Sequence, residues 1–238
     1  MRAKRDLKRE LQRAYAAPQP QRKREFLTKL GADRCSLAEF FLTQLGYIRK
    51  RVWILSAVIF AGGLRAGSRF PVEAVWIVSA GTPFLALILL TENGRSASCG
   101  MEELEAATRF SLKSVLLARM GGMGAVHGLL LLLLILFSAQ SSFLPAAAGG
   151  LFILVPYLLT VYIGTAALRR YHGREAVYLC IAIPAFVSGT LYLMKGAAHI
   201  FYSLRAVRWW AAAFLLLAAA ALRENYLLYK QTEEVSWS

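Results

Sequence analysis

Long apolar stretches recur along this chain, with short polar segments between them. The stretches Gly128 to Ala139 and Trp209 to Leu222 contain no charged residue. Domains that fold in water place polar residues among the core residues at the period of a helix or a strand, and these stretches do not. About 20 apolar residues suffice for a helix to cross the hydrocarbon core of a bilayer. The pattern predicts an all-α integral membrane protein with six transmembrane helices.

The limits of the apolar stretches place the six predicted spans. The first covers 52–64 and is short, so it needs Tyr47, Ile48 and the long side chains of Arg51 and Arg65 to extend it across the membrane. The other five are predicted at residues 71–91, 121–139, 143–168, 176–194 and 203–222.

Three of the predicted spans contain a proline, at Pro83, Pro156 and Pro184. Proline lacks the amide hydrogen that would bond to the carbonyl four residues earlier, and it kinks the helix. Lipid tolerates this when neighbouring helices supply donors to the freed carbonyl. We interpret these prolines first as packing devices.

The third predicted span carries His127 between two glycines, Gly124 and Gly128, at the GxxxG spacing that lets helices approach closely. No carboxylate or cysteine stands at metal-ligand spacing from it. The favoured interpretation is an interhelical hydrogen-bonding group, while a functional role for an ionisable side chain at this depth stays open.

A short amphipathic helix is predicted ahead of the first span. Ser36 and Glu39 have the spacing of a capping box, and the basic run 49–51 follows the helix. Its apolar face comprises Leu37, Phe40, Phe41, Leu45 and Ile48. This layout predicts an N-terminal helix lying in the membrane interface. The alternative is a helix packed on a soluble partner.

The polar segment between the second and third spans has its own charge pattern. Acidic residues gather near its start, and basic residues gather near its end, at Arg109, Lys113 and Arg119. This order matches the helix dipole and predicts a cytoplasmic helix at about 101–119. The acidic residues are Glu102, Glu103 and Glu105; an apolar side is formed by Leu104, Phe110, Leu112, Val115 and Leu116. We expect this side to lie against the membrane or a partner protein.

Charge then fixes the predicted orientation. The chain has 28 Lys and Arg against 14 Asp and Glu, and half of the basic residues fall in residues 1–51. With that tail inside, 23 of the 28 lie on the cytoplasmic side, as the positive-inside rule requires. The organisation predicted is a basic cytoplasmic tail at 1–51, a transmembrane domain at 52–222 and a cytoplasmic tail at 223–238. The predicted location is the cell membrane, with many passes and both termini cytoplasmic.

The basic tail could in principle mark a nucleic-acid-binding protein. A basic segment next to a membrane span is more typical of an orientation signal that contacts anionic lipids, so no nucleic-acid partner is predicted. Tryptophan and tyrosine near the predicted span ends form the aromatic belt of a membrane protein rather than base-stacking surfaces.

The sequence lacks intact catalytic motifs. No glycine-rich loop ends in GK[ST], and no HExxH could bind zinc. The Glu102-Glu103 pair would need an arginine at EExxxR spacing to match the CAAX-type membrane proteases, and Arg109 is two positions too far. Cys35, Cys99 and Cys180 show no CxxC spacing. We predict no enzyme activity, no cofactor and no metal.

Residues 110–119, FSLKSVLLAR, are similar to the "PVSR…GK" run that precedes the third span in permeases of type 2 ABC exporters, with Arg109 where that family has proline. The six-span layout, with an interfacial helix first and a cytoplasmic helix between spans two and three, also resembles that family. The resemblance implies that Glu102 to Ala118 is a coupling helix that docks on a cytoplasmic ABC ATPase. The residues it assigns to docking are Glu102, Glu103, Glu105, Arg109, Ser111 and Lys113.

In such an exporter, a homodimer or a heterodimer with a second permease would enclose the transport path, and alternating access would move the substrate. A different class remains open: a membrane-anchored regulatory or scaffold protein whose basic tail binds a signalling or transcriptional partner. The tail of about 50 residues is longer than an interfacial helix needs, which favours the second class.

Overall fold

The computed structural model describes residues 36–69, 74–94, 112–141, 145–171 and 174–235. These ranges are helical and contain no strand, which confirms the all-α prediction. Helix α3 (Leu37–Gly46) comes first. The long helices that follow it are α4 (Lys50–Arg69), α5 (Ala74–Asn93), α8 (Leu112–Ser141), α9 (Ala146–Arg170), α10 (Arg174–Leu193) and α12 (Val207–Val235). The short helices η1 (Met194–Ala197) and α11 (Ala198–Phe201) join α10 to α12.

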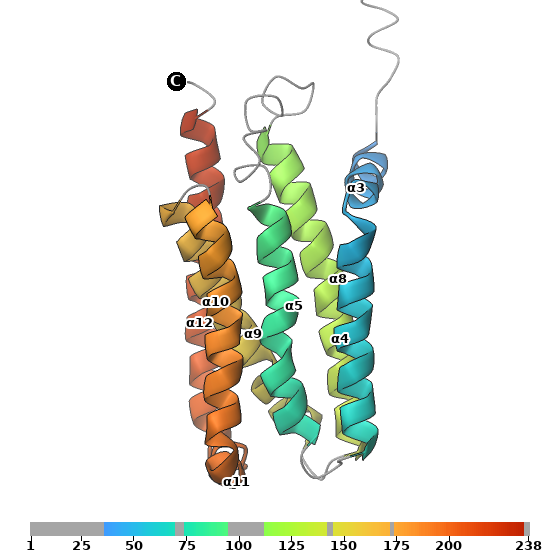
Figure 1. Cartoon of the computed structure of the whole chain (residues 1–238), viewed down its shortest axis with the longest axis vertical. Helices are drawn as coiled ribbons and strands as arrows, with labels where there is room; N and C mark the ends of the chain where they lie inside the picture. The colour runs from blue at the N-terminus through green and yellow to red at the C-terminus, as the bar shows by residue number, and fades with distance from the viewer. Residues whose placement is uncertain (1–35, 70–73, 95–111, 142–144, 172–173, 236–238) are drawn as a thin grey trace, which may run out of the picture. The chain divides into compact units, whose positions relative to one another are not determined.

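The chain divides into two compact units, Met1–Glu39 and Phe40–Ser238. The second unit is a bundle in which successive long helices run in opposite directions (Figure 1). Helices α5 and α9 form its centre, because each packs against four or more others. We call the end of the bundle that carries Arg49, Arg51 and Arg169 the arginine end; α11 lies at the other end, the α11 end.

Five described helices are long and apolar enough to cross a membrane. They are Val75–Asn93, Leu117–Gln140, Ala146–Arg170, Glu175–Leu193 and Val207–Lys230. These five correspond to the second to sixth predicted spans, as expected for a protein with many membrane passes. The α5 window is 67% buried inside the bundle and the α12 window 11%, so central and peripheral helices are distinct.

Helix α4 holds the first predicted span, and it is not among these five. It packs against α5 and α8 as a member of the bundle. Its 20 residues include a basic pair at each end, Lys50 with Arg51 and Arg65 with Arg69, which lowers its overall hydropathy. Its outward face is nevertheless apolar, with Ile54 and Val58 more than half exposed. That α4 crosses the membrane therefore stays a prediction.

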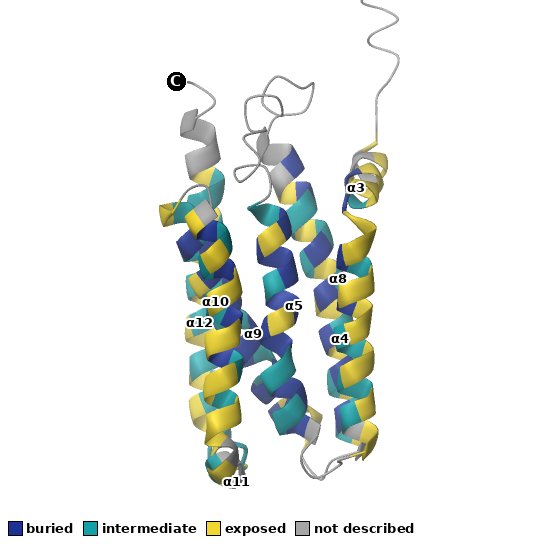
Figure 2. Ribbon diagram, in the orientation of Figure 1, coloured by how far each residue is buried: buried dark blue, intermediate teal, exposed yellow. Residues whose placement is uncertain are grey.

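Figure 2 shows exposed residues along the outward faces of the peripheral helices. Many large apolar side chains are exposed, whereas several small polar side chains are buried, unlike in a water-soluble bundle. Leu193 and Phe186 are 85% and 77% exposed, whereas Ser79, Thr160 and Thr165 have no exposed surface. Water would penalise the first group, and hydrocarbon would penalise exposure of the second. The bundle is therefore built for an apolar surrounding, independently of helix length.

Helix α3 begins with the capping box that the sequence predicts. The amide of Ser36 donates to Oε2 of Glu39 at 2.9 Å, and the amide of Glu39 donates to Oγ of Ser36 at 3.2 Å. Further along, Leu45 packs against Gly122 of α8, where a Cβ would lie 2.6 Å from Cδ2 of the leucine. Of the predicted apolar face, Ile48 is buried and Phe41 is 38% exposed. The side chains of Leu37 and Phe40 lie outside the described residues, and the interfacial position of α3 stays a prediction.

Two helices extend beyond the spans predicted for them. The third predicted span starts at 121, but α8 begins at Leu112 and is continuous to Ser141. The sixth is predicted to end at 222, but α12 continues to Val235. In α12 the cause is visible: Glu224, past the apolar stretch, pairs with Arg169 of α9 and keeps the added turns packed.

Candidate functional site

The interface between α5 and α9 contains two prolines whose missing amide hydrogens are replaced by hydroxyl groups. Pro156 leaves the carbonyl of Phe152 without its usual helix donor, and Ser79 of α5 donates to this oxygen at 2.8 Å. Pro83 does the same to the carbonyl of Ser79, which accepts from Thr82 at 2.9 Å. These buried hydroxyl groups are the donors that the predicted packing role of the two prolines requires.

The single hydroxyl hydrogen of Thr82 is shared between the carbonyl of Ser79 and, at 3.2 Å, the carbonyl of Ile153, so α5 contacts two successive carbonyls of α9. We call Ser79 and Thr82, with the carbonyls of Phe152 and Ile153, the hydroxyl seam. In hydrocarbon an unpaired carbonyl is costly, so each of these bonds holds α9 against α5.

Helices α5 and α9 also pack closely further along, toward the arginine end. A Cβ added at Gly164 of α9 would clash with the end of the Leu90 side chain, which is fully buried in α5. A larger residue at Gly164 would therefore have to displace Leu90. The GxxxG pair that the sequence singles out behaves differently, because a Cβ at Gly124 or Gly128 meets nothing within 4 Å. The expected close approach at that pair is wrong within this chain.

Tyr202, in the connection after α11, continues the seam toward the α11 end. Its hydroxyl lies 3.0 Å from Oγ of Ser79. Because Ser79 gives its hydrogen to Phe152, Tyr202 is the donor in this pair. The rings of Phe152, Tyr202 and Trp210 also contact one another, with centroids 5.1 to 5.5 Å apart, and Phe152 meets the other two edge to face. Burial raises the pKa of Tyr202 above its usual value of 10.

His127 lies buried among α4, α8 and α9. Its Nε2 is 3.2 Å from Oγ of Ser56, and its Nδ1 is 3.5 Å from the hydroxyl of Tyr157. A neutral imidazole has one donor and one acceptor nitrogen, and a hydroxyl can act as either partner. Both nitrogens are thus satisfied by a neutral ring, which agrees with the interhelical role favoured from the sequence. Within the described ranges no group of three or more metal-binding side chains occurs.

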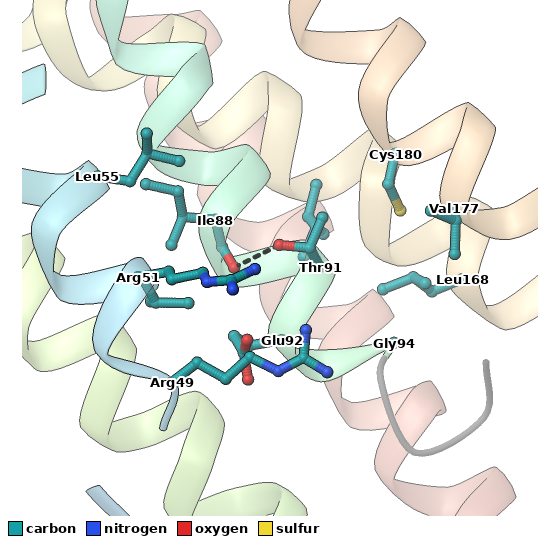
Figure 3. A pocket seen from close by; sticks show the side chains of 12 residues that line it. Arg49, Arg51, Leu55, Ile88, Thr91, Glu92, Gly94, Leu168, Val177 and Cys180 are labelled. Atoms are coloured by element: carbon teal, nitrogen blue, oxygen red, sulfur yellow. Dashed lines mark hydrogen bonds between the residues drawn. The ribbon is translucent and has the colours of Figure 1, made fainter. Parts of the chain in front are cut away.

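The arginine end also holds an open space, which Leu90 helps to line. A cavity of about 380 Å³ lies there between α4, α5, α9 and α10. Its wall is mainly apolar and includes Leu55, Ile88, Leu168, Val177 and Cys180. Arg49 and Arg51 border it from the α4 side, and Val177 and Cys180 lie on the opposite side, with α5 between them (Figure 3).

The polar groups of this cavity are concentrated at one edge. Arg49 and Arg51 are exposed, and Figure 3 shows both side chains extending toward the end of α5, where Glu92 and Thr91 lie. Glu92 is 7% exposed, and the Thr91 hydroxyl donates to the carbonyl of Ile88 at 3.0 Å. The cavity therefore combines an apolar interior with two guanidinium groups at its border.

An ion pair secures the helices beside the cavity. Nε of Arg169, in the last turn of α9, donates to Oε2 of Glu224 of α12 at 2.8 Å, and Nη2 lies 3.5 Å from Oε1. Both side chains are largely shielded from solvent, so the pair is stronger than an exposed one. This ion pair was not predicted from the sequence, in which Arg169 counts only among the basic residues expected on the cytoplasmic side.

The residues predicted to dock a partner fall mostly outside the described part of the chain. Glu102, Glu103, Glu105, Arg109 and Ser111 lie there, and so does the side chain of Lys113. The backbone of Lys113 belongs to the first turn of α8.

The cavity and the hydroxyl seam were not predicted from the sequence. Their residues come from four helices, and Ser79 stands alone in an apolar stretch. No protein family, no curated protein and no solved structure matches the chain.

Proposed function

We infer that this chain is the permease subunit of an ATP-driven exporter and that a separate ABC ATPase subunit hydrolyses the ATP. The single observation that favours this proposal is the continuity of α8. Its first residues, from Leu112, belong to the segment that resembles a coupling helix, and the same helix continues for 30 residues to Ser141. A displacement of residues 102–118 by a partner would therefore pass directly into the bundle.

The position of α3 supports the same proposal. Leu45 lies against Gly122, so the helix before the first span contacts α8 one turn beyond Ala118. A movement at the start of α8 would reach α3 and α4, which both pack on it. In the proposed mechanism the central pair α5 and α9 stays together while the helices around it tilt, and a second permease completes the substrate path.

Co-purification tests the proposal. The chain is expressed with the ABC ATPase encoded nearest to its gene, in mild detergent, and the recovered ATPase is quantified. Changing Glu102, Glu103 and Glu105 together to Lys is expected to reduce recovery at least tenfold. The control is a variant in which Glu175, an exposed residue of α10, is changed to Lys. Undiminished recovery of the ATPase by the triple variant contradicts the coupling assignment.

The regulatory alternative makes the opposite prediction for the basic tail. Deletion of residues 1–35 would abolish partner binding if the tail holds a regulator, and would leave ATPase recovery unchanged in an exporter. The length of that tail is the feature that favours this second class. The two variants measured side by side therefore separate the classes.

A further inference from the structure

We propose that the cavity at the arginine end is a binding site for an anionic phospholipid, with one acyl chain inside the cavity and the phosphate held by Arg49 and Arg51. This inference is independent of the exporter proposal, because it concerns the four helices that line the cavity and no partner protein.

The chemistry of the lining sets the class of ligand. A cavity of about 380 Å³ falls within the range of small-molecule sites. Its interior is formed by Leu55, Leu168, Val177 and Cys180, none of which can pair with a charged ligand. A soluble anion such as inorganic phosphate would gain nothing from this apolar wall. An amphiphile fills the wall with its chain and brings its charge to the border.

The border has the charge that an anionic head group needs. Arg49 and Arg51 make no hydrogen bond or ion pair to any side chain within the part of the chain that the structure describes, so their donors are available. They stand at the start of α4, where the helix dipole also favours a negative charge. Glu92 faces the same border and opposes an anion, but two guanidinium groups outnumber one carboxylate.

The place of the cavity in the bundle identifies the source of the amphiphile. α4 starts, and α5 ends, at the arginine end, which is where the apolar part of each helix meets its charged flank. Basic pockets between transmembrane helices at this depth bind the head groups of anionic lipids. A lipid reaches such a site sideways from its own leaflet, with its chain already in hydrocarbon.

Native mass spectrometry of the full chain, stripped of lipid in detergent, tests the proposal. Phosphatidylglycerol and phosphatidylcholine with identical acyl chains are titrated separately. We expect phosphatidylglycerol to bind at least tenfold more tightly. The variant with Arg49→Ala and Arg51→Ala should remove that preference. The matched control carries Arg65→Ala and Arg69→Ala, at the other end of the same helix, and should keep it.

Two further measurements locate the chain of the lipid. Phosphatidylglycerol with a photoreactive group in its acyl chain should label peptides containing Val177 and Cys180. Val177→Phe, which fills the cavity without altering charge, should reduce binding of phosphatidylglycerol several-fold, whereas Tyr178→Phe on the exposed side of α10 should not. Inorganic phosphate at millimolar concentration should not compete.

Several outcomes would overturn the proposal. One is equal affinity for the two lipids, and another is equal loss in both double-arginine variants, because each removes the role of Arg49 and Arg51. Labelling spread evenly over the bundle, or competition by inorganic phosphate with no effect of Val177→Phe, would exclude an acyl chain in the cavity. A melting temperature for each variant in detergent confirms that a loss of binding is not a loss of fold.

Discussion

The close contact between α5 and α9 differs sharply from the space beside it at the arginine end. Ser79 donates to a carbonyl of α9, and Gly164 lies so close to Leu90 that a Cβ would clash with the leucine side chain. Beside Leu90, helices α4, α5, α9 and α10 leave a cavity of about 380 Å³. Close packing and buried hydrogen bonds therefore hold α5 against α9, whereas the cavity is bordered by Arg49 and Arg51.

The strongest way to break this difference is to force apart the contact between Gly164 and Leu90. Gly164→Ile places a branched side chain against Leu90 and should lower the free energy of unfolding by about 3 kcal/mol or more. The measurement is reversible unfolding in mixed detergent and SDS. The same substitution at Gly189 of α10 is the control, because a Cβ there meets nothing within 4 Å.

A double variant shows whether the contact itself is responsible. Gly164→Ala combined with Leu90→Ala should be closer to the single Leu90→Ala variant than additivity predicts, because the second change removes the atoms that clash. Strict additivity of the two changes would contradict the close approach.

In the hydroxyl seam we expect a smaller loss of stability, which a second substitution should partly compensate. Ser79→Ala removes the donor to the carbonyl of Phe152 and should cost about 1 kcal/mol, the typical scale for such bonds in membrane bundles. Pro156→Ala restores an amide hydrogen to the same carbonyl. It should therefore destabilise the Ser79→Ala chain less than the wild-type chain, as measured by the same unfolding assay.

The control for this cycle is Ser68→Ala, because the Ser68 hydroxyl bonds only to the exposed carbonyl of Arg65 near the end of α4. It should change stability little. Equal cost of Pro156→Ala in both backgrounds would show that Ser79 does not replace the missing amide.

The buried hydroxyl of Tyr202 should make the stability of the folded chain depend on pH. Its pKa in the folded chain is raised by burial, whereas in the unfolded chain it stays near 10. Below pH 10 both states are protonated and stability is unaffected; above it the unfolded state loses the proton first, so stability falls as pH rises. Tyr202→Phe should make this fall shallower between pH 9 and 11.

The measurement for Tyr202 is stability in detergent as a function of pH, with Tyr178→Phe as the control because that side chain is 69% exposed. Identical slopes for the wild type and the Tyr202→Phe variant would argue against a buried phenol at this position.

The smallest effect is expected at the arginine end. Val177→Phe adds volume to a space that is already open, so in lipid-free detergent it should change the free energy of unfolding by less than about 0.5 kcal/mol. The assay is the one used for Gly164→Ile. A loss of stability comparable with that of Gly164→Ile would mean that the cavity is packed as tightly as the contact between Gly164 and Leu90.

Much of the fold follows from the sequence because apolar stretches define helices directly. The second, fourth and fifth predicted spans lie within a few residues of α5, α9 and α10. The extension of α12 was missed because a polar residue such as Glu224 can continue a helix when a distant partner, here Arg169, neutralises it. Hydropathy along the chain gives the limits of an apolar stretch but carries no information about such a partner. For α8, the residues before 121 were predicted as a separate cytoplasmic helix, but from Leu112 they are continuous with the span.

The candidate site was less predictable for the same physical reason. Pro156 could be expected to need a donor, but not that the donor would be Ser79, 73 positions earlier. Arg49 and Arg51 were identified as charges flanking α3, while the apolar wall beside them combines residues of α4, α5, α9 and α10. The glycines were misjudged because spacing alone marks Gly124 and Gly128, whereas Gly164, without that spacing, makes the close approach.

The hydrogen bond that Ser79 of α5 donates to α9 also limits how these two helices can move relative to each other. If the two helices slid apart, the oxygen of Phe152 would face hydrocarbon with neither an amide nor a hydroxyl, since Pro156 offers nothing in return. A conformational change that keeps this bond would therefore move α5 and α9 as one unit, and the relative motion would belong to α4, α8, α10 and α12.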